Sequence, residues 1–185
     1  QLAMATAIMA NKGQHITPHL LKSTTGTQTY SITNQSDGKV KFLGDETQWD
    51  LMHKAMRDVV HGRGTAGNLR KDLVGYEMAG KTGTAQVKGI KQGQRYDEKS
   101  LDERHLDHAW FMGFAPVDHP QVAVAVLVEN GKHGSSTAGP IAKAVFDYVI
   151  HQMNHDTLTT PNNTSNTSLN SSTTPTALTL ETDNE

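Results

Sequence analysis

The spacing of apolar and polar residues along the chain predicts two helices in its first third. Leu2 to Ala10 is rich in alanine and methionine with few polar breaks, which is typical of a buried helix. Asn11 and Gly13 are expected to end it. Thr47 to His61 carries apolar residues at helical spacing, so we predict a second helix with its first residue, Thr47, as N-cap and with Gly62 as its stop.

Three later segments have the pattern of strands. Met78 to Val87 is short, partly β-branched and bounded by glycines. His108 to Ala115 and Val122 to Glu129 follow it, joined by residues 116–120, which have a proline at each end and so predict a turn. Because the last of these strands is apolar on both faces, we expect it to be central in its sheet.

A final helix is expected after Ser136 or Thr137, either of which is a suitable N-cap, with Pro140 in the first turn. The face that we predict to be buried consists of Ile141, Ala144, Val145, Tyr148 and Val149. These elements together indicate an α/β fold in which an antiparallel sheet is flanked by helices.

Residues 154–185 have a different composition. Threonine, asparagine and serine dominate this stretch, which contains no aromatic residue and no periodic pattern. A segment of this kind buries too little apolar surface to offset the entropy lost on ordering. We therefore predict one domain over residues 1–153, followed by a disordered tail over residues 154–185.

Composition excludes several classes of function. The formal net charge is −2, which favours neither nucleic acid nor an anionic membrane surface as a partner. The chain has no cysteine, so disulfides and thiolate metal sites are excluded. The ten histidines include the pairs His105/His108 and His151/His155, but neither belongs to an H-E-x-x-H motif, so we predict no metal and no cofactor.

Two motifs include Lys81. The segment Gly75 to Thr82 matches the phosphate-binding loop G-x-x-x-x-G-K-[ST], whereas Lys81-Thr82-Gly83 matches the Lys-Thr-Gly element of penicillin-binding proteins and serine β-lactamases. A phosphate loop requires a buried strand before it and a helix after it. Here charged residues precede the motif, and Gly83 and Gly89 lie among the residues that follow. These features favour a strand.

The strand interpretation also explains the residue types. Thr82 and Thr84 lie two apart and therefore share one face, where two hydroxyls beside Lys81 can receive a carboxylate. Gly83 leaves room for another backbone or a ligand, and the N–H of Thr84 can stabilise a developing oxyanion. A structural strand without any role in a site is the alternative.

Further segments extend the Lys-Thr-Gly match in a consistent order. They are Gly64-Thr65-Ala66, the run from Ala79 to Gln86, the run from Trp110 to Pro116, Val122 to Val128, and Glu129-Asn130-Gly131 before the last helix. Over residues 1–153 the chain resembles the transpeptidase domain of class B penicillin-binding proteins. The stretch from Tyr96 to His108 resembles the elongation type, penicillin-binding protein 2.

The resemblance implies a function and a fold. Enzymes of this family acylate a serine with a peptidoglycan stem peptide, release D-Ala, and transfer the acyl group to an amine; β-lactams trap the serine. By position, Lys81 would be the catalytic lysine, and Thr82, Gly83 and Thr84 would bind substrate. The fold would be the C-terminal part of a transpeptidase or serine β-lactamase-like domain. The expected partners are stem peptides, β-lactams and membrane proteins of the elongation machinery, at the periplasmic face of the inner membrane.

The family's other motifs have no convincing match in this chain. Ser36 and Lys39 fit Ser-x-x-Lys, but they lie in a segment, residues 22–40, that is typical of turns and short strands. The sequence Ser-x-Asn occurs at Ser168, in the predicted tail. We therefore expect that the nucleophile and its base lie upstream of Gln1, and that this chain alone is inactive. A nucleotide-binding domain and a non-catalytic binding module remain alternatives.

Overall fold

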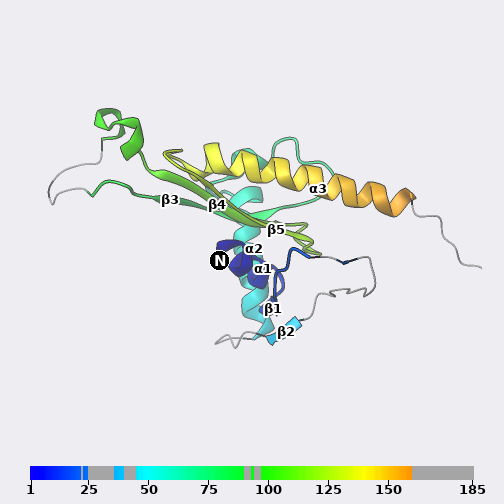
Figure 1. Cartoon of the computed structure of the whole chain (residues 1–185). Helices are drawn as coiled ribbons and strands as arrows, with labels where there is room; N and C mark the ends of the chain where they lie inside the picture. The colour runs from blue at the N-terminus through cyan, green and yellow to red at the C-terminus, as the bar shows by residue number, and fades with distance from the viewer. Residues whose placement is uncertain (22, 25–35, 40–44, 90–92, 94–96, 160–185) are drawn as a thin grey trace, which may run out of the picture.

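The computed structural model describes residues 1–21, 23–24, 36–39, 45–89, 93 and 97–159 (Figure 1). In chain order the helices and strands are α1 Leu2–Ala10, β1 Gln14–Ile16, β2 Ser36–Lys39, α2 Glu46–His61, β3 Ala79–Ala85, β4 His108–Ala115, β5 Val122–Val128 and α3 Gly139–Thr159. Among these described residues, no helix combines the length and the apolar character needed to cross a bilayer.

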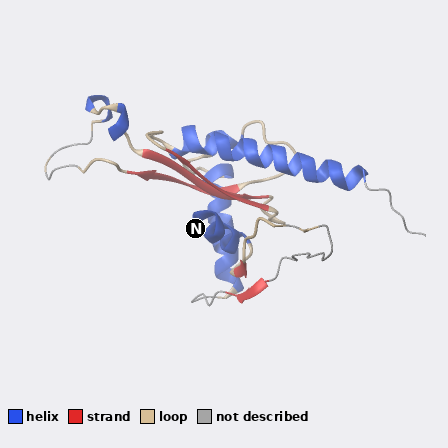
Figure 2. Ribbon diagram, in the orientation of Figure 1, coloured by secondary structure: helices blue, strands red, loops and turns tan. Residues whose placement is uncertain are grey.

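The central feature is an antiparallel sheet in the order β3-β4-β5 (Figure 2). Lys81 pairs with Met112, which in turn pairs with Ala125, so the three strands are in register across the sheet. The predicted turn at residues 116–120 connects β4 to β5, and the N–H of Val117 donates to the carbonyl oxygen of Glu77 at 3.0 Å. The predicted mixture of helices and an antiparallel sheet is thus confirmed.

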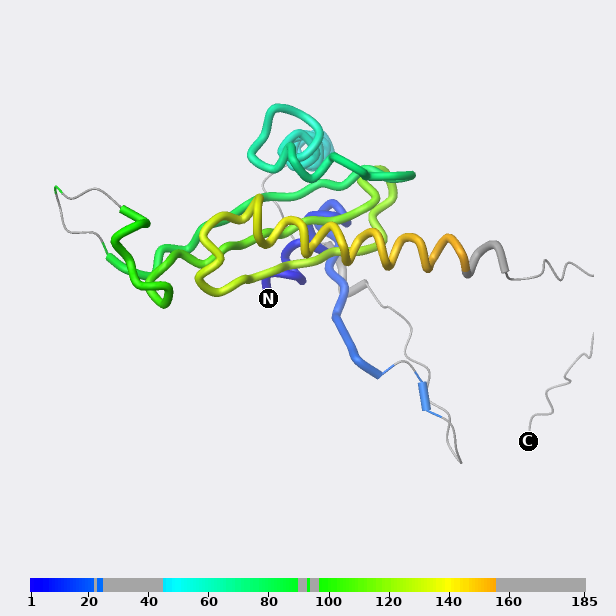
Figure 3. The backbone as a smooth tube through the Cα atoms, turned by 90° about the horizontal axis from the view of Figure 1, so that it is seen from above, coloured from blue at the N-terminus to red at the C-terminus, as the bar shows by residue number. Residues whose placement is uncertain are grey.

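Helices cover both faces of this sheet. Phe111 and Phe146 lie in the core between the sheet and α3, together with the valines at alternate positions of β5. On the opposite face, Phe114 packs with residues of α1 and α2 in a second apolar cluster. Figure 1 shows the long α3 on one side of the sheet and α1 on the other, with α2 running past the level of the sheet, and Figure 3 shows α2 beside β3.

The prediction that β5 is central was wrong: among the described strands β4 is central and β5 lies at an edge. Its apolar character on both faces has another cause, because α1 packs against β5 on one side and α3 packs against it on the other. Burial of both faces by helices therefore produces the same sequence pattern as a central position.

The predicted buried face of α3 was also wrong. Ala142 and Phe146 are fully buried and Ile150 is nearly so, whereas Ile141 is 47% exposed and Tyr148 is 68% exposed. The first half of the helix is apolar around most of its circumference, so periodicity alone fits two different faces. A π-helical turn, Gly134–Ala138, precedes α3 in place of a Ser or Thr cap.

The N-cap of α2 is Asp45 rather than Thr47, since the Asp45 side chain accepts the N–H of Gln48 at 3.3 Å. The predicted stop at Gly62 is confirmed, as are the bounds of α1 and its end at Asn11. Helix α3 continues to Thr159, so residues 154–159, which we predicted to belong to the tail, are helical. Residues 160–185 lie outside the described part of the chain.

Candidate active site

Lys81, Thr82, Gly83 and Thr84 all lie within β3, at the edge of the sheet away from β5. An edge strand has no neighbouring strand on one side, so the backbone N–H and C=O groups that point to that side take no part in the hydrogen bonding of the sheet. Alternation along β3 places Thr82 and Thr84 on the same face, as predicted. The four residues therefore lie together on one strand at the edge of the described sheet.

The Lys81 side chain is exposed, and its Nζ donates to the carbonyl oxygen of Thr82 at 2.6 Å. Among the described residues no carboxylate lies within ion-pair distance of this ammonium group. A carbonyl oxygen neutralises no charge, so Lys81 presents a positive charge at the edge where the hydroxyls lie. The geometry suits the binding of an anion.

Thr82 is partly buried, and its hydroxyl lies 2.7 Å from the hydroxyl of Thr65. Thr65 belongs to the short connection after α2. The N–H of Gly64 donates to the backbone carbonyl oxygen of Asp58 at 3.2 Å, and the N–H of Ala66 donates to that of Val59 at 3.0 Å. These two bonds fix the connection to the last turn of α2. The structure thus brings the Gly-Thr-Ala segment against the Lys-Thr-Gly strand.

Gly83 has close neighbours on both faces of the sheet. A Cβ on Gly83 would lie 3.0 Å from the Cβ of Trp110. On the other side, Gly134 approaches so closely that its own Cβ would lie 2.2 Å from the carbonyl oxygen of Trp110 and 2.8 Å from that of Gly83. The π-helical turn is further joined to the connection after α2 by Asn68, whose Nδ2 donates to the carbonyl oxygen of Ser135 at 2.9 Å.

Several polar contacts hold the chain where it enters β3. Arg57 forms two hydrogen bonds to the carboxylate of Glu77, and these bonds, opposed by burial, lower the pKa of Glu77. The ring of His61 accepts the N–H of Met78 at 3.2 Å. Tyr76 donates to Asp147 at 2.7 Å, which ties the same segment to α3, and burial together with this bond raises the pKa of Tyr76. These contacts position β3 before the site begins.

The phosphate-loop interpretation of Lys81 was wrong. The strand continues through Thr82 to Ala85, and residues 86–89 beyond it are not helical. A phosphate cradle needs the N-terminus of a helix at this point. In addition, Glu77 inside the motif is engaged by Arg57.

Ser36 and Lys39 lie in β2, which pairs with β1 in a separate two-stranded sheet. The sequence predicted a turn or short strand there and not the helix start that a Ser-x-x-Lys nucleophile needs, and the backbone agrees with the strand. Ser168 lies outside the described residues. Within the described residues no group of three or more histidine, aspartate or glutamate side chains is arranged to hold a metal ion.

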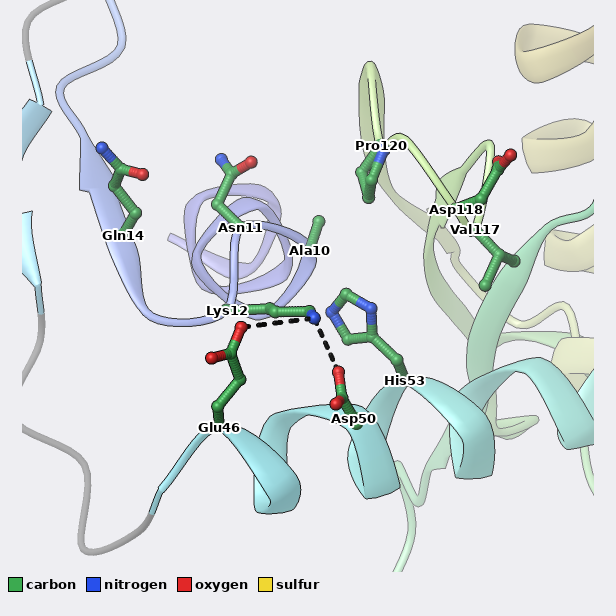
Figure 4. Close-up of a pocket in the computed structure, with 10 residues that line it drawn as sticks. All are labelled: Ala10, Asn11, Lys12, Gln14, Glu46, Asp50, His53, Val117, Asp118 and Pro120. Carbon is green, nitrogen blue, oxygen red and sulfur yellow. Dashed lines mark ion pairs between the residues drawn. The ribbon is translucent and has the colours of Figure 1, made fainter.

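A pocket of about 540 Å³ lies elsewhere, between the end of α1, the start of α2 and the β4–β5 turn (Figure 4). Lys12 extends into it and pairs with Asp50 at 2.6 Å, and this hydrogen bond raises the pKa of Lys12. His53 is buried at its floor and donates Nε2–H to the carbonyl oxygen of Met9 at 2.8 Å. Residues 81–84 do not line this pocket, so it is distinct from the Lys81 strand.

Sequence reasoning placed Lys81, Thr82, Gly83 and Thr84 correctly on one strand but assigned no role to Thr65 or Gly134. Thr65 lies in an irregular connection and Gly134 begins a short π-helical turn, and no periodic pattern in the sequence indicates what either residue contacts. The one signal for Thr65 was that Gly64-Thr65-Ala66 precedes the Lys-Thr-Gly element in the same order as in the family that the sequence resembles.

Known proteins of one family are similar to this chain in sequence and in fold. Residues 1–147 match the family model described as the penicillin binding protein transpeptidase domain. The peptidoglycan D,D-transpeptidase MrdA of Acinetobacter baumannii is 53% identical over 148 residues, which cover 80% of this chain and 21% of that protein. MrdA of Escherichia coli K12 is 32% identical over 154 residues, covering 81% and 24%.

Solved structures show the same relationship. Pseudomonas aeruginosa PBP2 in complex with WCK 5153 is 38% identical with a TM-score of 0.60, over 80% of this chain and 29% of that one. Penicillin-binding protein A from Mycobacterium tuberculosis, as a ceftriaxone acyl-enzyme complex, is 28% identical with a TM-score of 0.58, over 78% and 30%. The chain spans between a fifth and a quarter of the length of its two MrdA relatives. It belongs to the penicillin-binding protein transpeptidase family, and within that family to the PBP2/MrdA type.

Proposed function

We propose that this chain supplies the Lys-Thr-Gly strand of a peptidoglycan D,D-transpeptidase that works through a serine acyl-enzyme. In the first step a serine oxygen attacks the carbonyl carbon between two D-Ala residues of a stem peptide. The peptide bond breaks, and the terminal D-Ala leaves with a proton. In the second step an amine of another stem attacks the ester, forms a new peptide bond and regenerates the serine. A β-lactam acylates the same serine through opening of its ring amide.

The observation that carries this proposal is the edge strand β3, which carries one ammonium group and two hydroxyls within four consecutive residues. Thr82 and Thr84 would donate to the terminal carboxylate of the stem peptide or of the β-lactam. Lys81 would add positive charge to the site and take part in the proton-transfer network once its Nζ leaves the Thr82 carbonyl oxygen. The N–H of Thr84 would stabilise the oxyanion, and Gly83 would keep the strand accessible.

The nucleophile and its base, in this proposal, belong to a part of the protein outside these 185 residues. Two observations support this. Ser36 lies in a strand of the small sheet and not at the start of a helix. The related transpeptidases are also about four to five times as long as the stretch that this chain covers, so they have ample room for another set of motifs.

We further propose that the intact protein acts at the periplasmic face of the inner membrane, with membrane proteins of the elongation machinery as partners. The support for such partners is the likeness to PBP2 from Helicobacter pylori, which was solved in complex with MreC and is 25% identical with a TM-score of 0.55; the location rests on the resemblance to the family alone. Stem peptides and β-lactams would be its small ligands.

Acylation by fluorescent penicillin tests the proposal. In the intact protein we expect Lys81→Ala to slow acylation strongly, because losing one positioned donor at a developing charge costs on the order of 2.7–4 kcal/mol, or ~10²–10³ in rate. Lys39→Ala is the matched control, because Lys39 belongs to β2 of the separate two-stranded sheet and not to the β3–β4–β5 sheet. The 185-residue chain alone should not be acylated.

Two results would contradict the proposal. One is an unchanged acylation rate for the Lys81→Ala variant of the intact protein. The other is saturable binding of magnesium-ATP that Lys81→Ala abolishes, which would restore the nucleotide-binding alternative.

A further inference from the structure

The contact between Thr65 and Thr82 is the feature of the site that the proposed function leaves unused. Their hydroxyl oxygens lie 2.7 Å apart, which is a good hydrogen-bond distance for two hydroxyls. We propose that Thr65 is a positioning residue, which directs the hydroxyl proton of Thr82 toward the carboxylate of the ligand. This inference rests on the proposed function, because it assumes that Thr82 binds that carboxylate.

The proposal follows from how many protons are available. A hydroxyl has one proton to donate and can accept at its lone pairs. When Thr82 donates to a carboxylate, the hydrogen bond with Thr65 persists only if Thr65 donates to Thr82. Thr65 then occupies an acceptor position of the Thr82 oxygen and leaves its proton for the anion. Successive hydrogen bonds of this kind polarise and strengthen one another.

Thr65 is held rigidly enough to act in this way. The N–H of Gly64 and that of Ala66 are both bonded to carbonyl oxygens near the end of α2, so the backbone is fixed on each side of Thr65. Ala66 is fully buried. A Cβ on Gly64 would lie 2.3 Å from the Cα of Val59, which shows how tightly this connection packs on the helix.

The position of Thr65 also suits a role at the ligand. Its side chain is exposed, whereas that of Thr82 is partly buried, so the pair lies between the strand and solvent. Lys81 and its positive charge are adjacent in sequence to Thr82. The hydroxyl of Thr65 therefore contacts the group that, in the proposed function, donates to the incoming carboxylate.

The competing explanation is that the Thr65–Thr82 contact only links the two segments structurally. A positioning role affects only ligands that carry a carboxylate, whereas a structural role affects every ligand. The test uses the intact protein and compares the second-order rate of acylation by penicillin with that by its methyl ester. Thr65→Val keeps the shape of the side chain and removes the hydroxyl. Thr65→Ser keeps the hydroxyl.

We expect Thr65→Val to lower the rate for penicillin by roughly twofold to tenfold, the equivalent of one hydrogen bond, and to leave the rate for the ester unchanged. Thr65→Ser should react like the unaltered protein with both probes. The double variant Thr65→Val/Thr82→Val should be no slower than Thr82→Val, because the two hydroxyls act as one unit.

An equal fall for penicillin and its ester in Thr65→Val would overturn the inference, since it would indicate general damage to the site. So would additive effects of the two valine substitutions. If Thr82→Val and Lys81→Ala both leave penicillin acylation unchanged, the proposed function itself fails. If those two variants are slow and Thr65→Val is not, the positioning role alone fails.

Discussion

The contact between Gly134 and the sheet predicts that a single methyl group will disturb the site without touching any of its polar residues. In Gly134→Ala the new Cβ would lie 2.2 Å from the carbonyl oxygen of Trp110, 2.8 Å from that of Gly83 and 3.1 Å from the Gly83 nitrogen. All three are backbone atoms of paired strands, so they cannot rotate out of the way as a side chain would. The π-helical turn and β3 must therefore move apart.

The expected size of the effect follows from this overlap. Forcing an extra methyl group into a packed interior costs typically about 1–3 kcal/mol of stability. A displacement of β3 also shifts Thr82 and Thr84 relative to the ligand, and a misplacement of about 1 Å can lower a rate by ~10²-fold. We therefore expect both a lower melting temperature and a slower acylation by penicillin.

The assay is fluorescent-penicillin acylation of the intact protein, with thermal unfolding measured on the same preparations. Gly89→Ala is the matched control, because a Cβ at that position meets nothing within 4 Å. The control should behave like the unaltered protein in both measurements. If Gly134→Ala were as stable and as reactive as Gly89→Ala, the packing of the π-helical turn on the Lys-Thr-Gly strand would be refuted.

Two further predictions concern what holds the sheet and its helices together. Phe146→Ala should destabilise the domain by about 3–5 kcal/mol because Phe146 is fully buried, whereas Tyr148→Ala, at a position 68% exposed, should destabilise it by no more than about 0.5 kcal/mol. Amide hydrogen exchange of α3 and β4 measures both effects. A larger loss of stability in Tyr148→Ala than in Phe146→Ala would contradict the assignment of the buried face of α3. Because Arg57 lowers the pKa of Glu77 below its unfolded value, the pair stabilises the fold above that value and this contribution disappears as the pH falls through the lowered pKa. Both side chains are more than a third exposed, so the effect is small. The melting temperature of Arg57→Met should fall less on acidification than that of the unaltered protein. A melting temperature with the same pH dependence in both proteins would argue against the pair.

Strand and helix limits were predictable wherever a clear local signal occurs. β4 occupies the predicted residues His108–Ala115, and α2 ends at the predicted Gly62. These features depend on neighbouring residues alone, namely an apolar run between turn residues and a glycine after a helical period. The placement of Lys81 and the two threonines on one strand follows from the same local rules.

Tertiary arrangement was harder to predict, for reasons that β5 and α3 illustrate. The apolar residues of β5 do not distinguish a neighbouring strand from a helix on each face. In α3 both Phe146 and Tyr148 lie on apolar stripes, and the position of the sheet decides which of them is buried. Thr65 meets Thr82 across 17 positions of sequence through an irregular connection, so its contact is a property of the folded chain.

The position of the bound β-lactam tests the role of β3 most directly. It would be measured in a crystal structure of the intact protein acylated by penicillin. We predict that the carboxylate of the antibiotic lies within about 3.2 Å of the hydroxyl of Thr82 or Thr84, and that the acyl bond joins a serine outside residues 1–185. A carboxylate that contacts neither threonine, or an acyl bond to Ser36, would contradict it.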